Sequence, residues 1–96
     1  MQEKTPKKLT PNELEHILSD HHRWVETEGT RGRKADLRCY ELSNRNLFGV
    51  DLRMAVLKDT DFSHANLRTA NLKQADLYNC RFHQADFQHR FQRFGP

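Results

Sequence analysis

A Leu or Phe recurs at every fifth position between residues 35 and 89, without a gap. Two places before it the chain mostly has a small residue, and one place before it mostly Asp or Asn. The eleven central positions are Leu37, Leu42, Leu47, Leu52, Leu57, Phe62, Leu67, Leu72, Leu77, Phe82 and Phe87. An apolar stripe of this period would spiral around an α-helix and change faces along a β-strand. The repetition instead predicts a solenoid, in which each unit buries its apolar residue by stacking on copies of itself.

Four of these units read ADLRC (residues 35–39), ANLRT (65–69), ANLKQ (70–74) and ADLYN (75–79). They resemble consecutive repeats of the pentapeptide-repeat family, and the repeated stretch covers 55 of the 96 residues. The resemblance implies a mainly β fold, a right-handed quadrilateral parallel β-helix with four units per coil, whose central and small residues point inward. Eleven units at four per coil make 2.75 coils.

The first coil departs from the family's pattern, and we expect it to be irregular. Tyr40 and Arg45 stand where small residues recur, and Glu41 replaces the usual Asp or Asn. Val56 and Arg81 are further replacements of this kind. The remaining Asp and Asn residues before the central position suit the tight corners that such coils must turn, which indicates a structural role.

Ahead of the repeats, residues 10–29 have the start and stop signals of a helix. Thr10 is the predicted N-cap, Pro11 the first helical residue, and Glu13 closes a capping box. Gly29 ends the helix, which we expect over residues 11–28. The remaining segments are a flexible tail at 1–9, a basic connector at 30–34 and a C-terminal tail at 90–96.

This helix is predicted to cap the first coil. Its apolar stripe consists of Leu14, Ile17, Leu18, His21 and Val25, with Trp24 beside it. A helix of about four turns is marginally stable alone, so the stripe must lie on another apolar surface. The open end of the first coil is the nearest one. The predicted cap residues are Leu14, Ile17, Leu18, Trp24 and Val25.

Composition supports a narrow solenoid rather than a conventional core, because 35% of the residues are hydrophobic and 30% are charged. The chain shows no membrane span and no secretory signal, and we expect one soluble cytoplasmic domain without membrane insertion. Cys39 and Cys80 lack metal-ligand spacing, and their places in the repeat make a disulfide between them unexpected.

The sequence predicts no catalytic, cofactor or metal site. The six His residues lack the spacing of a metal site. His16 and His22 each lie four residues before an acidic residue, Asp20 and Glu26, which is a surface pairing. An interior filled by Leu and Phe leaves no concavity for catalytic groups. We therefore expect a protein that is not an enzyme.

Basic residues twenty positions apart should stack in columns along the sides of the coil. Arg53 and Lys73 form one such column, continued by Arg93, and Arg38 and Lys58 form another. These columns are a possible face for an acidic partner, or a solvated surface. The net charge of +3 is small, which makes nucleic acid an unfavoured partner.

Two functional interpretations remain open. One is a protein-interaction or scaffold module, such as a small subunit of a larger assembly. The other is a modulator of nucleic acid or of a topoisomerase such as DNA gyrase, acting through charged faces. Some members of the family mimic DNA and bind type II topoisomerases, which requires a long acidic rod. This chain is short and its repeats balance seven basic against seven acidic residues, so that role is not carried over.

The C-terminal end of the stack is the predicted interface. Beyond Phe87 the chain is too short for a second capping helix, and four of the six Phe residues gather there: Phe82, Phe87, Phe91 and Phe94. An exposed strand edge with apolar neighbours is a template for pairing. We expect an end-to-end homodimer. The alternative is that Phe91 and Phe94 fold back and plug the end.

Overall fold

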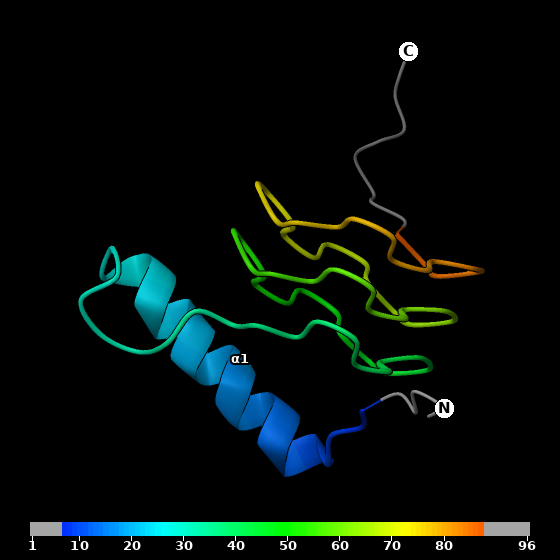
Figure 1. Ribbon diagram of the computed structural model, residues 1–96, viewed down its shortest axis with the longest axis horizontal. Helices are drawn as coiled ribbons and strands as arrows, with labels where there is room; N and C mark the ends of the chain where they lie inside the picture. The colour runs from blue at the N-terminus through cyan, green and yellow to red at the C-terminus, as the bar shows by residue number, and fades with distance from the viewer. Residues whose placement is uncertain (1–6, 88–96) are drawn as a thin grey trace, which may run out of the picture.

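The computed structural model describes residues 7–87, which form one α-helix beside a stack of coils (Figure 1). Helix α1 spans Pro11–Glu26. Its N-terminus has the predicted capping box: the Thr10 hydroxyl accepts from the Glu13 amide at 3.1 Å, and the Glu13 carboxylate accepts from the Thr10 amide at 2.9 Å. The helix ends two residues earlier than predicted, with Thr27 as its C-cap, and Gly29 follows at a φ of +87°.

The repeats stack at an interval of twenty residues. Parallel β-bridges join Asp36 to Val56, Glu41 to Asp61, Asn46 to Asn66, Asp51 to Asn71, Val56 to Asp76, Asp61 to Arg81 and Asn66 to Asp86. One coil therefore holds four units, and the described chain contains coils 35–54 and 55–74 and part of a third. The β-helix-like solenoid is present, while its right hand and square cross-section stay predictions.

In the described part of the chain the β-bridges are isolated and no continuous strand forms, so the expected mainly β content stays a prediction. The physical reason for the isolated bridges is the length of a side. Each five-residue unit must also turn a corner, so the backbone stays extended for too few residues to build a ladder. Stacking is maintained by single bridges repeated around each coil.

Within residues 35–85, every unit except the second turns its corner in the same way. The carbonyl of the central residue accepts from the amide three residues on, as Leu57 does from Thr60 at 3.1 Å. The residue two places after the centre has a φ between +56° and +66° in nine units, the sign that type II turns require at their third position. The side chain before the centre accepts from the amide after it in seven units: Asp36, Asn46, Asp51, Asp61, Asn66, Asn71 and Asp76. The predicted corner role of Asp and Asn is confirmed.

The first coil is more regular than expected. Its bridges keep the twenty-residue register, and the departure is local to the second unit. There, within residues 7–87, the Arg45 amide makes no corner hydrogen bond to Leu42. The Arg45 guanidinium instead donates to the Leu9 carbonyl, and Tyr40 packs partly buried against the core.

The predicted flexible tail is wrong at its end. Lys7 forms a parallel bridge with Tyr40, its carbonyl accepting from the Glu41 amide at 2.7 Å. Leu9 packs partly buried against the core. The backbone of the first coil has unpaired groups on its outer edge, and these residues satisfy some of them.

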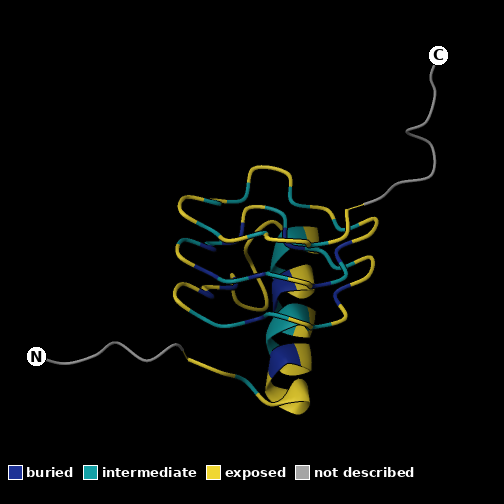
Figure 2. Cartoon of the chain, turned by 90° about the vertical axis from the view of Figure 1, so that its right-hand side faces the viewer, coloured by how far each residue is buried: buried dark blue, intermediate teal, exposed yellow. Residues whose placement is uncertain are grey.

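The core lies inside the first two coils, and Figure 2 shows the buried residues concentrated there. The central residues from Leu37 to Leu67 are at most 3% exposed, and Leu14 of α1 belongs to the same core. From Leu72 to Ala85 the inward residues are only partly buried, and Phe87 is exposed. Over residues 7–87, no helix has the length and apolar character needed to cross a membrane.

Candidate functional site

The two ends of the stack differ in how they are covered. The end that carries α1 is called the lower end here, and the last coil is the upper end, as oriented in Figure 1. At the lower end Leu14 is 7% exposed, while Ile17 and Leu18 pack partly buried against the same core. Trp24 and Val25, the other predicted cap residues, are half-buried.

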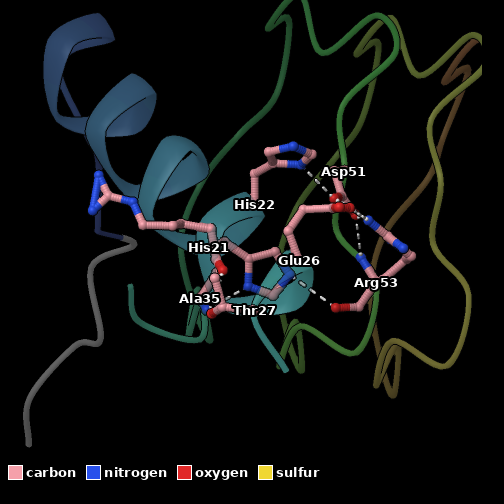
Figure 3. Close-up of polar contacts among 8 residues, drawn as sticks. His21, His22, Glu26, Thr27, Ala35, Asp51 and Arg53 are labelled. Carbon is pink, nitrogen blue, oxygen red and sulfur yellow. Dashed lines mark hydrogen bonds and ion pairs between the residues drawn. The ribbon is translucent and has the colours of Figure 1, made fainter. Parts of the chain in front are cut away.

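His21 joins α1 to the first coil (Figure 3). Its Nε2 donates to the Arg53 carbonyl at 2.8 Å, and its Nδ1 accepts from the Ala35 amide at 2.9 Å. Higher in the stack the equivalent carbonyl, that of Lys58, accepts from the Cys39 amide of the coil below. The imidazole therefore replaces a donor that a further coil would supply.

An ion-pair cluster lies beside this imidazole, at the surface. Arg53 donates twice to Asp51, both at 2.8 Å, and once to Glu26 of α1 at 2.9 Å. His22 Nδ1 lies 2.8 Å from Asp51, which makes Asp51 its partner rather than the expected Glu26. The guanidinium of Arg53, foremost, holds the pKa of Asp51 well below its usual range. His16 does approach Asp20, at 3.9 Å.

The same cluster resembles a metal-ligand set, because the ligand atoms of His22, Glu26 and Asp51 lie within 4.8 Å of one another. The Arg53 guanidinium already donates to both carboxylates, so a cation occupies the position that a metal ion would take. We assign these residues to an ion-pair cluster.

The predicted basic columns are largely engaged within the molecule. Arg53 is held by the cluster, and Arg38 donates twice to Asp36 at 2.8 Å. The Lys58 ammonium lies 5.7 Å from the centre of the Tyr78 ring. Lys73 is exposed. These contacts reduce the positive charge available to phosphate groups or to an acidic partner.

A groove of about 400 Å³ lies between α1 and the first coil, where the sequence predicted no concavity. It lies outside the coil, which is why the filled interior gave no sign of it. It is lined by Pro11, Leu14, Glu15, Leu18, Asn44, Arg45, Asn46 and Leu47. This lining contains no Ser, Thr, Cys, Lys or His side chain.

No further coil covers the upper end within the described part of the chain, and this end is the candidate interaction site. Phe87 is 39% exposed, and its ring centre lies 5.3 Å from that of Phe82. Within residues 7–87 the amides of Leu72 and Leu77 have no backbone partner, whereas the Leu52 amide, one coil below, donates to Asn71 at 2.9 Å. Within residues 7–87, the upper edge therefore combines backbone donors that have no backbone partner with apolar side chains. Phe91 and Phe94 lie outside the described residues.

Sequence reasoning had placed His21 in the helical stripe but missed its two hydrogen bonds. The signal was a His at the centre of an apolar stripe, flanked by Leu18 and Val25. A buried imidazole must satisfy both ring nitrogens. Its partners could not be identified, because they lie 14 and 32 residues away and depend on how α1 docks.

Comparison with known proteins gives one match. The family described as pentapeptide repeats (8 copies) matches residues 55–89. No curated protein and no solved structure matches the chain. The matched region begins with the second coil, and the first coil continues the same twenty-residue register below it. Residues 55–89 therefore match the pentapeptide-repeat family, which confirms over that stretch the resemblance seen in the sequence.

Proposed function

We propose that this protein is a non-enzymatic interaction module that binds a protein partner through its upper end. The observation that carries the proposal is the change in burial along one column of central residues. Leu37 and Leu57 are fully buried, whereas Leu77, next in the same column, is only partly buried. A partner that covers the upper end would extend the core by one layer.

The chemistry of the upper edge favours protein over other ligands. Rows of unpaired backbone donors and acceptors are satisfied best by another backbone, which adds to the edge as a further strand. Phe82 and Phe87 lie beside these rows, and aromatic residues are enriched at the centre of protein interfaces. Polypeptide supplies both kinds of contact.

A second copy of the chain is the simplest partner. The lower end is covered by α1 and by Lys7, so a copy cannot stack there without displacing them. Two upper ends can meet, and such an interface closes about a two-fold axis without growing into a filament. A subunit of a larger assembly is the other partner that fits, and it would use the same surface.

Light scattering at rising protein concentration tests the dimer. We expect the parent protein to dimerise and Phe87→Ser to shift it towards monomer. Phe48→Ser is the matched control, because Phe48 is 60% exposed on the side of the stack, away from the upper end. Phe91→Ser and Phe94→Ser examine the alternative that the chain plugs its own end.

A parent protein that stays monomeric at high concentration would exclude the homodimer. The broader proposal then requires a heterologous partner whose binding is lost in Phe87→Ser and kept in Phe48→Ser. Equal binding by the two variants would contradict an interface at the upper end.

A further inference from the structure

We propose that His21 is a proton-sensitive latch, which holds α1 on the first coil while its ring is neutral and releases the helix when the ring is protonated. The latch lies at the lower end, opposite the proposed interface, and does not depend on it. Release would uncover the lower edge of the first coil, including the Arg53 carbonyl that His21 now satisfies.

The two hydrogen bonds of His21 admit only one protonation state. A backbone amide can only donate, so Nδ1, which accepts from Ala35 at 2.9 Å, carries no proton. A carbonyl can only accept, so Nε2, 2.8 Å from the Arg53 oxygen, carries one. A proton added to Nδ1 would point at the amide hydrogen of Ala35 and break that hydrogen bond.

The loss of these two His21 hydrogen bonds would weaken the packing of α1 on the first coil. His21 is 0% exposed, so no water can replace a broken bond without movement of the helix. Ala35 begins the first coil and Arg53 lies in its last unit, so one side chain joins α1 to both ends of that coil. Within the described chain, Leu14 is the other buried residue of α1.

The groups around His21 do not compensate for a charged ring. The coil contributes Asp51 and Arg53 and the connector contributes Lys34, while on α1 itself His22 is adjacent and the Trp24 ring stacks at 5.7 Å. Burial is the largest influence and lowers the pKa of His21, against the hydrogen bond to the Arg53 carbonyl and the attraction of Asp51, which raise it. The carboxylate of Asp51 accepts from Arg53 and stays ionised in mild acid, so its own titration does not mimic the latch.

The direction of the pH dependence follows from this difference. The released helix exposes His21, whose ring then has the ordinary pKa of about 6.5, whereas the docked ring has a lower one. The released state therefore binds more protons as the pH falls below about 6.5. The equilibrium constant for release should rise by up to about tenfold per pH unit, until the pH reaches the lowered pKa of the docked ring.

Amide hydrogen exchange of the Ala35 N–H, followed by NMR between pH 7.5 and 4.5, measures release directly. After correction for intrinsic exchange, we expect the protection of Ala35 to fall by up to about tenfold per pH unit in the acidic range. The Asp76 amide, which bonds to Ala55 inside the stack, reports unfolding of the coils and should keep its protection. A parallel loss at Asp76, or no loss at Ala35, would overturn the latch.

Two variants assign the effect to the ring. His21→Gln keeps one donor and one acceptor but cannot be protonated, so the protection of Ala35 should lose its pH dependence. His22→Gln removes the neighbouring imidazole and should leave that dependence intact. If both variants respond as the parent does, His21 is not the latch.

A direct titration keeps the test independent of how well the variants fold. The ring resonances of His21 in the parent protein should show the Nε2–H tautomer at neutral pH and a pKa below the ordinary value. Titration of His21 at or above the ordinary pKa, in the folded protein, would also overturn the proposal.

Discussion

The ring of Phe82 lies on the ring of Phe62, twenty residues earlier in the chain, with centroids 5.4 Å apart and planes within 5° of parallel. The two residues occupy the same position of the repeat in successive coils. Phe62 is fully buried because a coil covers it, whereas Phe82 is only partly buried at the upper end. The contact between the two rings therefore joins the fully buried core to the partly exposed layer at the upper end.

Replacing these two residues should have unequal effects on stability. Phe62→Ala removes a fully buried ring and should lower the free energy of unfolding by about 3–5 kcal/mol. Phe82→Ala removes a ring that is already partly hydrated, so its effect should be clearly smaller. Urea denaturation of both variants measures the difference. Equal losses in dilute protein would show that the upper end is covered after all.

Truncating the apolar face of α1 should destabilise the whole stack. Leu14→Ala removes a side chain that is 7% exposed and belongs to the coil core, so we expect a loss of about 2–5 kcal/mol. The control is Asn12→Ala, which changes an exposed position of the same helix. The midpoint of thermal unfolding, followed by circular dichroism, compares them. A Leu14→Ala protein that melts with the parent would show that α1 does not support the coils. Leu18→Asp extends the test to a half-buried position.

The Thr60 hydroxyl is expected to stabilise the second coil through one hydrogen bond. It is buried and donates to the Leu37 carbonyl at 2.6 Å. Thr60→Val keeps the shape and leaves that carbonyl without its side-chain donor, which should cost about 1–3 kcal/mol. Thr60→Cys should recover part of the loss, because one coil higher the Cys80 thiol donates to Leu57 in the same way. Burial raises the pKa of that thiol and keeps its proton in place. Equal unfolding free energies for the parent and the Val variant would contradict this role.

Gly32 is expected to tolerate no side chain. Its φ is +75°, and a Cβ there would lie 2.2 Å from the Asp20 carbonyl oxygen, on the backbone of α1. Gly29 also has a positive φ, but its nearest such contact is the Trp24 side chain at 3.6 Å. Gly29→Ala should therefore show only the conformational penalty of about 1–2 kcal/mol, and Gly32→Ala a larger loss. Thermal melting of the two variants gives the comparison, and similar melting temperatures would contradict the close packing of the connector on the helix.

The two members of the predicted basic column should behave differently. Arg53→Ser leaves Asp51, whose side chain is 17% exposed, without its main partner, and should lower the free energy of unfolding more than Lys73→Ser does. Lys73→Ser changes an exposed side chain and should stay within about 0.5 kcal/mol. Chemical denaturation at low and high salt distinguishes them. An Arg53→Ser protein with the unfolding free energy of the parent would show that the ion-pair cluster does not contribute to stability.

The stacking register could be predicted from the sequence because it depends on local repetition. A central Leu or Phe every five residues, with Asp or Asn before it, requires one corner per unit, and the hydrogen bonds of Asp51 and Asn71 to the amides two residues on show that each corner is built locally. The capping box of Thr10 and Glu13 was accessible for the same reason, since its partners are three residues apart.

The contacts at the lower end could not be predicted from the sequence in the same way, because they join distant parts of the chain. Arg53 was expected to lie in a basic column on the side of the coil, and its pairing with Glu26 depends on where α1 lies. Lys7 lies in a polar segment that the sequence predicted to be a tail, yet its backbone forms a bridge with Tyr40 and accepts a hydrogen bond from the Glu41 amide. Each of these contacts occurs once, at the end of the stack, and is not repeated from coil to coil. The periodic pattern of the sequence therefore does not predict them.

The twenty-residue interval also determines which changes in chain length this architecture can absorb. In each unit the residue before the centre bridges to the residue twenty places away, as Asp36 does to Val56 and Val56 to Asp76. Insertion of a single residue would turn each later inward side chain towards solvent, and insertion of one five-residue unit would rotate each later side by one position. Duplication of twenty residues would add a whole coil and leave every existing contact in place. Growth of such a protein by duplication should therefore proceed in whole coils, with the helix at one end and the proposed binding surface moved outward at the other.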